Sequence, residues 1–240
     1  MIITLLTGKT SKLREQIKNE LNIDINVKRN SRAKKMTLKI DGKNQIPTLS
    51  MPTLASNKLG FNFVKNNISW IEDKLSQTVK PEKFQDNERI SIFGKELTIK
   101  HCPEQKLGVQ IDGDILKVSG EKGFLHRRVK DFIKKQAKDE FYKLSKAKAL
   151  LVGCKLNSVV IKDTKSRWGS CSSYGNINYN WRVALAPYFV IEYLVSHEVS
   201  HLKHQDHSKE FWVCVKNLYP EYIKGKNWLK NNGKKLNIYE

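Results

Sequence analysis

The stretch HEVSHLKHQDH, which runs from His197 to His207, decides how the rest of the chain is interpreted. His197 and His201 are four residues apart, so on an α-helix both imidazoles lie on one face, where they can bind a single metal ion. Glu198 is rotated by about 100° around the same helix. It therefore does not coordinate with the pair, but it can reach a water molecule on the same ion. The HExxH pattern predicts two metal ligands, His197 and His201, and a general base, Glu198.

Two further histidines are candidates for a third ligand, which a catalytic zinc ion needs while it keeps its fourth position open for water. His204 lies seven residues after His197. On a continuous helix this is roughly 10 Å along the axis, too far for both nitrogens to lie about 2 Å from one ion. His207 reaches the ion if the helix ends near His204 and the chain turns back. Ser208 suits the N-cap of a new helix, so the prediction is His207 as third ligand and His204 as a neighbour.

The residues before the motif predict that it lies on a helix. Pro187 is well placed at the start, and an apolar stretch follows it. A chance HExxH would rarely have both this apolar helix and a third histidine ten residues on. The main alternative to a catalytic site is a zinc site that is structural or has lost its activity.

Three runs around the motif carry a resemblance to a known family. They are RWGSCSS (Arg167 to Ser173), GNINYNWRVALAP (Gly175 to Pro187) and HEVSHLKHQDHSKEFW (His197 to Trp212). They resemble the YgjP-like metallopeptidase family, a bacterial relative of the WLM and SprT zincins. The resemblance is strongest over residues 166–212. It is looser from about residue 26, where VKRNSRAKKMTLKI is similar to the basic N-terminal strand of the family.

The resemblance implies an α+β fold, a minimal zincin-like catalytic domain in which a mixed or antiparallel sheet accompanies the HExxH helix. It implies two histidines on that helix, a third in the turn after it, and the glutamate as base. These positions correspond to His197, His201, His207 and Glu198. One departure is Ser200, where relatives usually carry alanine, and it has no evident effect on the chemistry.

Motif and resemblance together predict a zinc-dependent metallopeptidase that acts on a protein or peptide substrate. Zn²⁺ would lower the pKa of its bound water from near 16 to about 7, and Glu198 would take the proton. Arg167 is a further candidate, because a guanidinium near the metal can bind a substrate carboxylate or stabilise an oxyanion. Equally, Arg167 can stack on Trp168 and hold the loop together. It therefore stays outside the predicted catalytic set.

The net charge of +20 raises a second hypothesis. It favours attraction to polyanions such as nucleic acid or an anionic membrane surface, although a solvated lysine-rich surface is an equal explanation. The alternative function is a basic nucleic-acid-binding protein with a structural zinc site. The two combine if the substrates are proteins associated with nucleic acid, as WLM and SprT relatives cleave proteins crosslinked to DNA. The basic cluster Lys28, Arg29, Arg32, Lys34 and Lys35 is more simply a solvated strand edge.

The remaining composition bears on cellular location. Four cysteines without a CxxC pair are typical of reduced thiols, and the N-terminus lacks the pattern of a signal peptide. No run approaches the roughly 20 apolar residues of a membrane span. A soluble, cytoplasmic protein is expected, and the sequence does not specify its oligomeric state. Cys171 is predicted as a small packed side chain rather than a redox-sensitive group or alternative metal ligand.

The domain prediction has three parts: an N-terminal extension over 1–25, an N-terminal β/α module over 26–85, and the zincin-like metallopeptidase domain over 86–240. The module should contain two strands around Asp41-Gly42 and one amphipathic helix over 57–77. In the last part we expect a helix over 125–144, a strand over 157–162 and a helix over 208–218. Strict alternation over 175–185 predicts one strand at a sheet edge, running into the metal helix.

Overall fold

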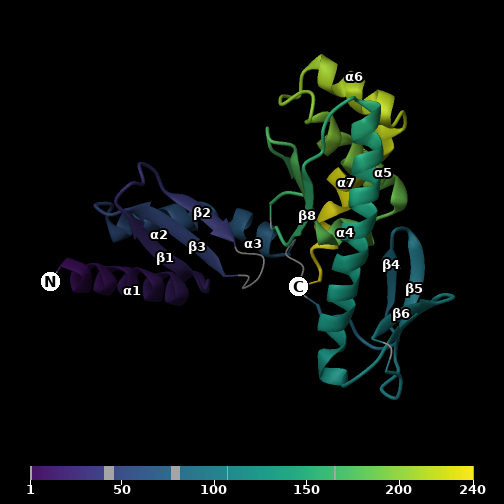
Figure 1. The fold of residues 1–240 in the computed structure, drawn as a ribbon. Coiled ribbons are helices and arrows are strands. Elements are labelled where there is room, and N and C mark those ends of the chain that lie inside the picture. The colour runs from purple at the N-terminus through teal and green to yellow at the C-terminus, as the bar shows by residue number, and fades with distance from the viewer. Residues whose placement is uncertain (1, 41–45, 77–81, 107, 165, 240) are drawn as a thin grey trace. The chain divides into compact units, whose positions relative to one another are not determined.

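The computed structural model describes residues 2–40, 46–76, 82–106, 108–164 and 166–239 (Figure 1). The chain divides into two compact units, Met1–Pro81 and Glu82–Glu240, each with its own hydrophobic core. The division falls four residues before the expected boundary between 85 and 86. Since the two units are separate bodies, each is described by itself.

The first unit combines a three-stranded sheet with three helices. Its strands are β1 (Asn26–Asn30), β2 (Thr37–Ile40) and β3 (Pro47–Pro52), and its helices are α1 (Ile2–Leu21), α2 (Asn57–Lys65) and α3 (Ile68–Ser76). The strand order is β1-β3-β2, with β1 parallel and β2 antiparallel to β3. The sequence predicted the β2–β3 pair but not β1 as a separate strand. The predicted turn at Asp41-Gly42 lies outside the described residues.

Helix α1 belongs to this unit and is not an extension to it. Its side chains Leu13 and Ile17 are fully buried in the same core as Leu49 and Val64. Residues 2–25, which we expected to form an appendage, are therefore part of the folded unit. This packing could not be predicted from local patterns, because it depends on residues of the sheet and of α2 that are distant in sequence.

The amphipathic segment after β3 forms two helices instead of the single predicted one. Asn66 is the C-cap of α2, and its backbone N–H donates to the carbonyls of Asn62 and Val64. The amide of Asn67 donates to the carbonyl of Phe63 at 2.8 Å. An asparagine side chain can compete in this way for backbone hydrogen bonds, and that of Asn67 does so where α2 ends, while the apolar period continues.

Arg29, one of five residues in the predicted basic cluster, has a structural function. Its guanidinium donates to the carbonyls of Thr53 and Ala55 at 2.8 and 2.7 Å, and to Oδ1 of Asn57 at 2.7 Å. These bonds connect β1 to the start of α2. Arg29 is thus engaged within the protein and does not present its charge to a partner.

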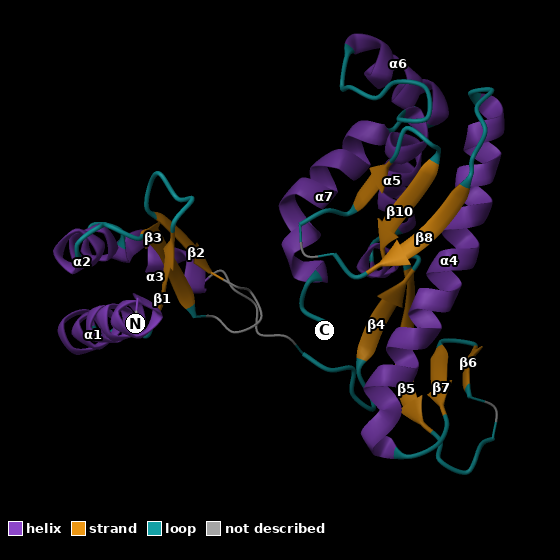
Figure 2. Cartoon of the chain, turned by 60° about the vertical axis from the view of Figure 1, so that its left-hand side comes forward, coloured by secondary structure: helices purple, strands orange, loops and turns teal. Residues whose placement is uncertain are grey.

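The second unit is organised along the long helix α4 (Leu125–Leu151). A four-stranded sheet in the order β4-β5-β7-β6 lies toward one end of α4, and a three-stranded sheet in the order β8-β10-β9 lies toward the other (Figure 2). The strands are β4 (Arg89–Ile92), β5 (Lys95–His101), β6 (Val109–Asp112), β7 (Ile115–Val118), β8 (Ser158–Lys162), β9 (Gly169–Cys171) and β10 (Asn176–Asn180). The other helices are η1 (Lys122–Phe124), η2 (Trp181–Leu185), α5 (Tyr188–Ser200), α6 (Lys209–Leu218) and α7 (Tyr222–Leu236).

This unit has the expected α+β arrangement, in which a mixed sheet accompanies the helix that carries the HExxH motif. Strand β10 pairs in parallel with β8 and antiparallel with β9. The helix predicted over 125–144 extends to Leu151, because Lys148 and Ala149 are also buried.

The prediction of one edge strand over 175–185 was wrong in two respects. Strand β10 ends at Asn180, and Trp181–Leu185 form a 3₁₀ helix whose residues are all buried. The turn begins at Asn180, whose side-chain oxygen accepts from the backbone N–H of Arg182 at 3.0 Å. Furthermore, β10 is the central strand, so the edge next to the metal helix belongs to β9. The alternation of apolar and polar residues does not identify a strand over Trp181–Leu185, because all of these residues are buried.

Arg182, a residue of this buried 3₁₀ helix, shows how the burial of a charged group is tolerated. Its guanidinium donates to Asp163 at 2.5 Å and to the carbonyl of Tyr239 at 2.8 Å. It also lies over the ring of Trp181, 4.7 Å from the centroid. A charged group can be buried at tolerable cost when it is paired and hydrogen-bonded in this way.

Helices α5 and α7 make a close contact through Gly225. A β-carbon at this position would collide with Cβ of Tyr193 and lie 2.9 Å from the carbonyl of Phe189. Gly225→Ala should therefore destabilise the second unit by about 1–3 kcal/mol, because the backbones would have to separate. Denaturant unfolding measures this loss. Asn227→Ala, at an exposed position on the same helix, is the control, and equal stability of the two variants would contradict the close contact.

Candidate metal centre

The metal motif lies where α5 ends and α6 begins. His197 is in the last turn of α5, and His201 is its C-cap. The new helix starts at Lys209, and the hydroxyl of its N-cap, Ser208, accepts from the backbone N–H of Phe211 at 3.4 Å. The predicted break after the motif and the predicted cap at Ser208 are both confirmed. The chain turns back between the two helices and brings His207 over the end of α5.

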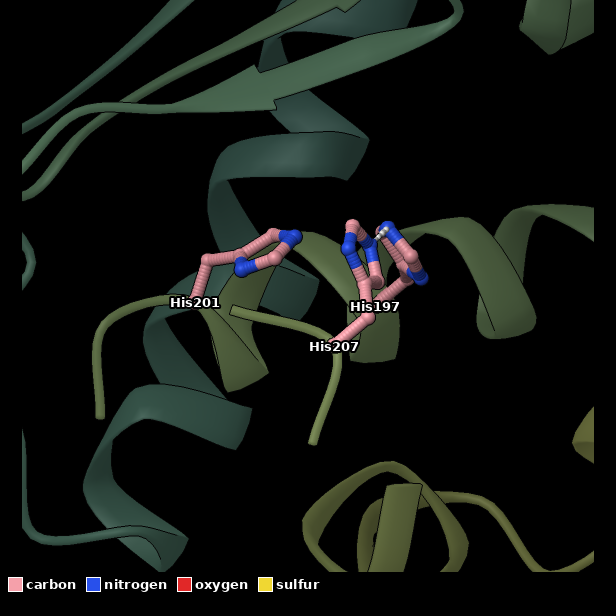
Figure 3. A group of neighbouring side chains, drawn as sticks. All are labelled: His197, His201 and His207. Atoms are coloured by element: carbon pink, nitrogen blue, oxygen red, sulfur yellow. Dashed lines mark hydrogen bonds between the residues drawn. The ribbon is translucent and has the colours of Figure 1, made fainter. Parts of the chain in front are cut away.

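Three imidazoles meet at this turn: His197, His201 and His207 (Figure 3). One ring nitrogen of each lies within 4.8 Å of the others. The Nε2 atoms of His197 and His207 are 3.3 Å apart. Two nitrogens bound to one tetrahedral zinc ion at about 2.0–2.1 Å would be separated by about 3.3–3.4 Å. The donor set and this separation therefore fit an ion such as zinc.

His204 contributes through its backbone and not through its ring. Nδ1 of His201 lies 2.9 Å from the carbonyl oxygen of His204. When Nδ1 is the protonated nitrogen it donates to this carbonyl, and Nε2 is left with a free lone pair directed into the cluster. The histidine that we predicted as a neighbour thus orients one of the three rings.

Aromatic side chains from α6 form the floor of the cluster. Phe211 is fully buried, and its ring centroid lies 5.0, 4.5 and 4.8 Å from those of His197, His201 and His207. The ring of Trp212 lies 5.8 Å from His197 and 6.0 Å from His207. These two aromatic residues contact the ligand loop and restrict the rotamers of the imidazoles that they touch.

Burial keeps two of the imidazoles neutral. It lowers the pKa of His197 to about 3, with further contributions from the nearby His201, His207 and Lys226. Burial also lowers the pKa of His201. A histidine binds metal only through an unprotonated nitrogen, so these shifts prepare the site for a cation. Nδ1 of His197 is buried and has no hydrogen-bond partner in the described part of the chain.

Glu198 lies on α5 outside the histidine cluster and is only 4% exposed. In the metal-free protein, burial raises the pKa of its carboxyl to about 8. A cation nearby would favour the ionised form and oppose this effect. A carboxyl group whose pKa is close to neutral is suited to accepting and returning a proton.

Gly169 on β9 provides the space that Glu198 occupies. A β-carbon at residue 169 would collide with Oε1 of Glu198 and lie 2.6 Å from Cδ and 2.7 Å from Cγ. Gly169 was not among the residues to which the sequence pattern assigned a function. The available signal was a glycine within a short strand, which often indicates that another group approaches closely.

Polar contacts behind the metal helix fix its position. Nζ of Lys148 on α4 lies 2.7 Å from a carboxylate oxygen of Glu192 on α5 and donates to the carbonyl of Leu218 at 3.1 Å. The hydroxyls of Ser145 and Tyr179 are 2.9 Å apart and buried. These contacts connect α4 with α5, α6 and β10, so α4 joins the elements around the metal motif.

Two residues of the RWGSCSS run, Cys171 and Arg167, each had more than one role considered from the sequence. Cys171 is not part of the histidine cluster, and burial raises the pKa of its thiol to about 12, so it is a packed side chain as predicted. Trp168 packs against Gly233 of α7. Arg167 makes no ring contact, ion pair or side-chain hydrogen bond with any residue that the structure describes, so the stack on Trp168, one of the two alternatives for this residue, is not observed.

Comparison with known proteins gives the class and then the family. The model of the YgjP-like, metallopeptidase domain family matches residues 34–232. This chain is therefore a metallopeptidase by family. It belongs to the YgjP-like family, as the runs around the motif had indicated.

Two other comparisons were made. No curated protein matches the chain. Among solved structures, the chain is similar to the crystal structure of the metallopeptidase zymogen of Pyrococcus abyssi abylysin, with 22% identity and a TM-score of 0.36. That similarity covers 38% of this chain and 93% of the other. No helix in the described part of the chain is long and apolar enough to cross a membrane.

Proposed function

We propose that this chain is a zinc-dependent metallopeptidase in which His197, His201 and His207 hold the ion and Glu198 is the general base. The observation that carries the proposal is the convergence of three imidazole nitrogens within 4.8 Å, beside a buried carboxyl that does not belong to the cluster. Three protein ligands leave one tetrahedral position for water, as catalytic zinc sites require.

A bound zinc ion would supply Lewis acidity, which lowers the pKa of a coordinated water to about 7 and polarises a peptide carbonyl. Glu198 accepts a proton from the attacking water and returns it to the leaving amine. Its burial beside Gly169 keeps the carboxylate in one orientation. The His204 carbonyl keeps His201 in the tautomer whose Nε2 is available.

The edge of β9 offers a place for the substrate backbone. In the three-stranded sheet, β9 pairs with β10 on one side only, and its residue Gly169 touches the base. An extended peptide can add to such an edge through main-chain hydrogen bonds. A peptide bound there passes directly beside Glu198.

The proposal is tested by metal analysis of the purified protein together with hydrolysis of casein or a peptide library. We expect about one zinc per chain and hydrolysis that stops when zinc is chelated and resumes when it is restored. The alternative of a structural zinc in a nucleic-acid-binding protein gives the opposite pattern: no hydrolysis, and unfolding on chelation. Zinc-loaded, folded protein without peptidase activity would contradict the proposal.

Substituting individual histidines separates the ligand from its neighbour. His207→Ala should reduce zinc affinity by at least about 100-fold, because it removes one of three ligands. His204→Ala keeps the backbone carbonyl that contacts His201, so it should retain zinc. Metal content and competition with a chelator measure both affinities. If His204→Ala lost the metal and His207→Ala kept it, the third ligand would be wrongly assigned.

A further inference from the structure

A cavity of about 290 Å³ lies beside the start of β9. It is formed by the segment before β9 and one face of α7. Its charged residues are Arg167, Lys230 and Lys234, and none of the described residues that line it is acidic. This composition favours a negatively charged occupant.

The walls of the cavity are fixed in the free protein. The Asn180 amide donates to the Thr164 carbonyl at 2.7 Å, and the Asn180 backbone N–H donates to the Trp168 carbonyl at 2.8 Å. The Thr164 hydroxyl donates to the carbonyl of Arg167 at 2.6 Å. On the other side, Gly233 allows α7 to lie against the Trp168 ring. The backbone around the cavity is therefore preformed, and only the exposed side chains of Arg167 and Lys230 would have to be ordered by a ligand.

Two of the cations have no partner within the described part of the protein. Neither Arg167 nor Lys230 makes a side-chain hydrogen bond or an ion pair there. Arg182 and Lys148, which are buried, instead pair with carboxylates. Arg167 and Lys230 line the same cavity, so their charges are available for the same ligand.

Helix α7 carries a stripe of lysines that is not needed for the stability of the helix. It has five lysines and no acidic residue, and Lys226, Lys230 and Lys234 follow one another at intervals of four. Like charges at this spacing destabilise a helix. Lys234 is in the last turn, where it stabilises the helix dipole, but this reason does not apply to Lys226 or Lys230.

The lysine stripe connects the cavity with the metal centre. Nζ of Lys226 lies 3.8 Å from the centroid of Trp212, which lies beside His197 and His207. Lys230 and Lys234 line the cavity. Positive charge therefore continues from the histidine cluster to the cavity along one side of α7.

The position of Arg167 indicates that the cavity lies near the proposed base, Glu198. Arg167 precedes Gly169 by two residues, which span at most about 7 Å of chain. Gly169 touches Glu198. A peptide bound along the edge of β9 would have its scissile bond beside Glu198. A side chain about two residues from that bond would then lie near the cavity.

We propose that this cavity is a specificity subsite that binds an acidic side chain of the peptide substrate, with Arg167 and Lys230 as its partners. The inference rests on the proposed function and adds a substrate class to it. A guanidinium forms paired hydrogen bonds with a carboxylate, and the ammonium group adds a point charge. The ligand chemistry is that of an anion on a peptide, either a carboxylate or a phosphorylated side chain.

The test uses pairs of fluorogenic peptides that differ only by Glu or Gln, scanned over the positions on both sides of the scissile bond. With the zinc-loaded full chain, kcat/KM should favour Glu over Gln by on the order of ten-fold at one position, about two residues from that bond. Arg167→Gln and Lys230→Gln should each reduce this preference, and the double variant should abolish it. Lys235→Gln removes the same charge from α7 outside the cavity and should keep the preference.

Binding provides a second readout that does not require catalysis. Labelled Glu and Gln peptides are titrated into the Glu198→Gln variant at physiological ionic strength, and fluorescence anisotropy gives Kd. If no peptide is hydrolysed by the wild type, the proposed function fails, while a Kd preference for Glu that disappears in Arg167→Gln still supports the subsite. Tighter binding of a phosphoserine peptide supports the same subsite and identifies its anion as phosphate.

Three results would overturn the proposal. They are equal kcat/KM and Kd for the Glu and Gln peptides, a preference that survives in the double variant, and a preference lost equally in Lys235→Gln. The last result would mean that overall charge, and not the cavity, attracts acidic peptides. A single-stranded oligonucleotide that binds through Arg167 and Lys230, when Glu peptides show no preference, would assign the cavity to nucleic acid instead.

Discussion

Glu198→Gln is expected to leave zinc bound and to reduce peptide hydrolysis by about 10²–10⁴-fold, the usual contribution of a general base. Glutamine has nearly the same shape as glutamate and fits the space beside Gly169, but its amide cannot accept the proton. Glu198 is not one of the three residues proposed to bind the metal, so the metal should be retained. Metal content and kcat/KM of the same preparation measure the two quantities.

Glu210→Gln is the matched control for this experiment. Glu210 lies in the first turn of α6, close in sequence to the ligand loop, but it is exposed. The same chemical change at this position should leave both zinc and kcat/KM close to their wild-type values. If Glu198→Gln hydrolysed peptides as fast as the wild type, Glu198 would not be the base.

Gly169→Ala is the second substitution with a large expected effect. The new β-carbon would occupy the place of the Glu198 carboxylate, so the base has to move away from the reacting centre. A displacement of about 1 Å can cost about 10²-fold in rate, and we expect a loss of at least this size. Zinc binding should persist, since Gly169 does not contact the histidines through any described interaction. Steady-state kinetics and metal analysis test both statements.

Gly123→Ala provides the comparison, because a β-carbon at residue 123 would meet no atom within 4 Å. This variant should keep the activity of the wild type. If Gly169→Ala retained full activity, the carboxylate of Glu198 would have another orientation available, and its confinement by β9 would not matter for catalysis. Loss of zinc together with activity would instead show that β9 supports the ligands.

Much of the site could be predicted because its determinants are local. The spacing of His197 and His201, the end of the helix and the cap at Ser208 all depend on residues within one or two helical turns. Gly169 could not be assigned in the same way. Its function depends on a contact with Glu198 that spans 29 residues of sequence, and the spacing of residues within the strand does not reveal it.

The fold was less predictable wherever tertiary packing opposed the local pattern. The alternating residues of Trp181–Leu185 looked like a strand, but burial on all sides and the cap at Asn180 favour a 3₁₀ helix. The apolar period over 57–76 concealed the interruption at Asn66. The first helix carried no motif, so its place in a core was evident only from the side chains around Leu13 and Ile17.

The existence of two unconnected hydrophobic clusters has a consequence for thermodynamic measurements. One cluster contains buried residues from Leu13 to Ile71, and the other contains buried residues from Phe84 to Leu236. A chain with two such clusters is not obliged to melt in a single cooperative step, so one Tm for the whole protein is not a well-defined quantity. Calorimetric scans should be fitted with two transitions, and only the transition that shifts on zinc addition reports on the second unit, where the histidine cluster lies.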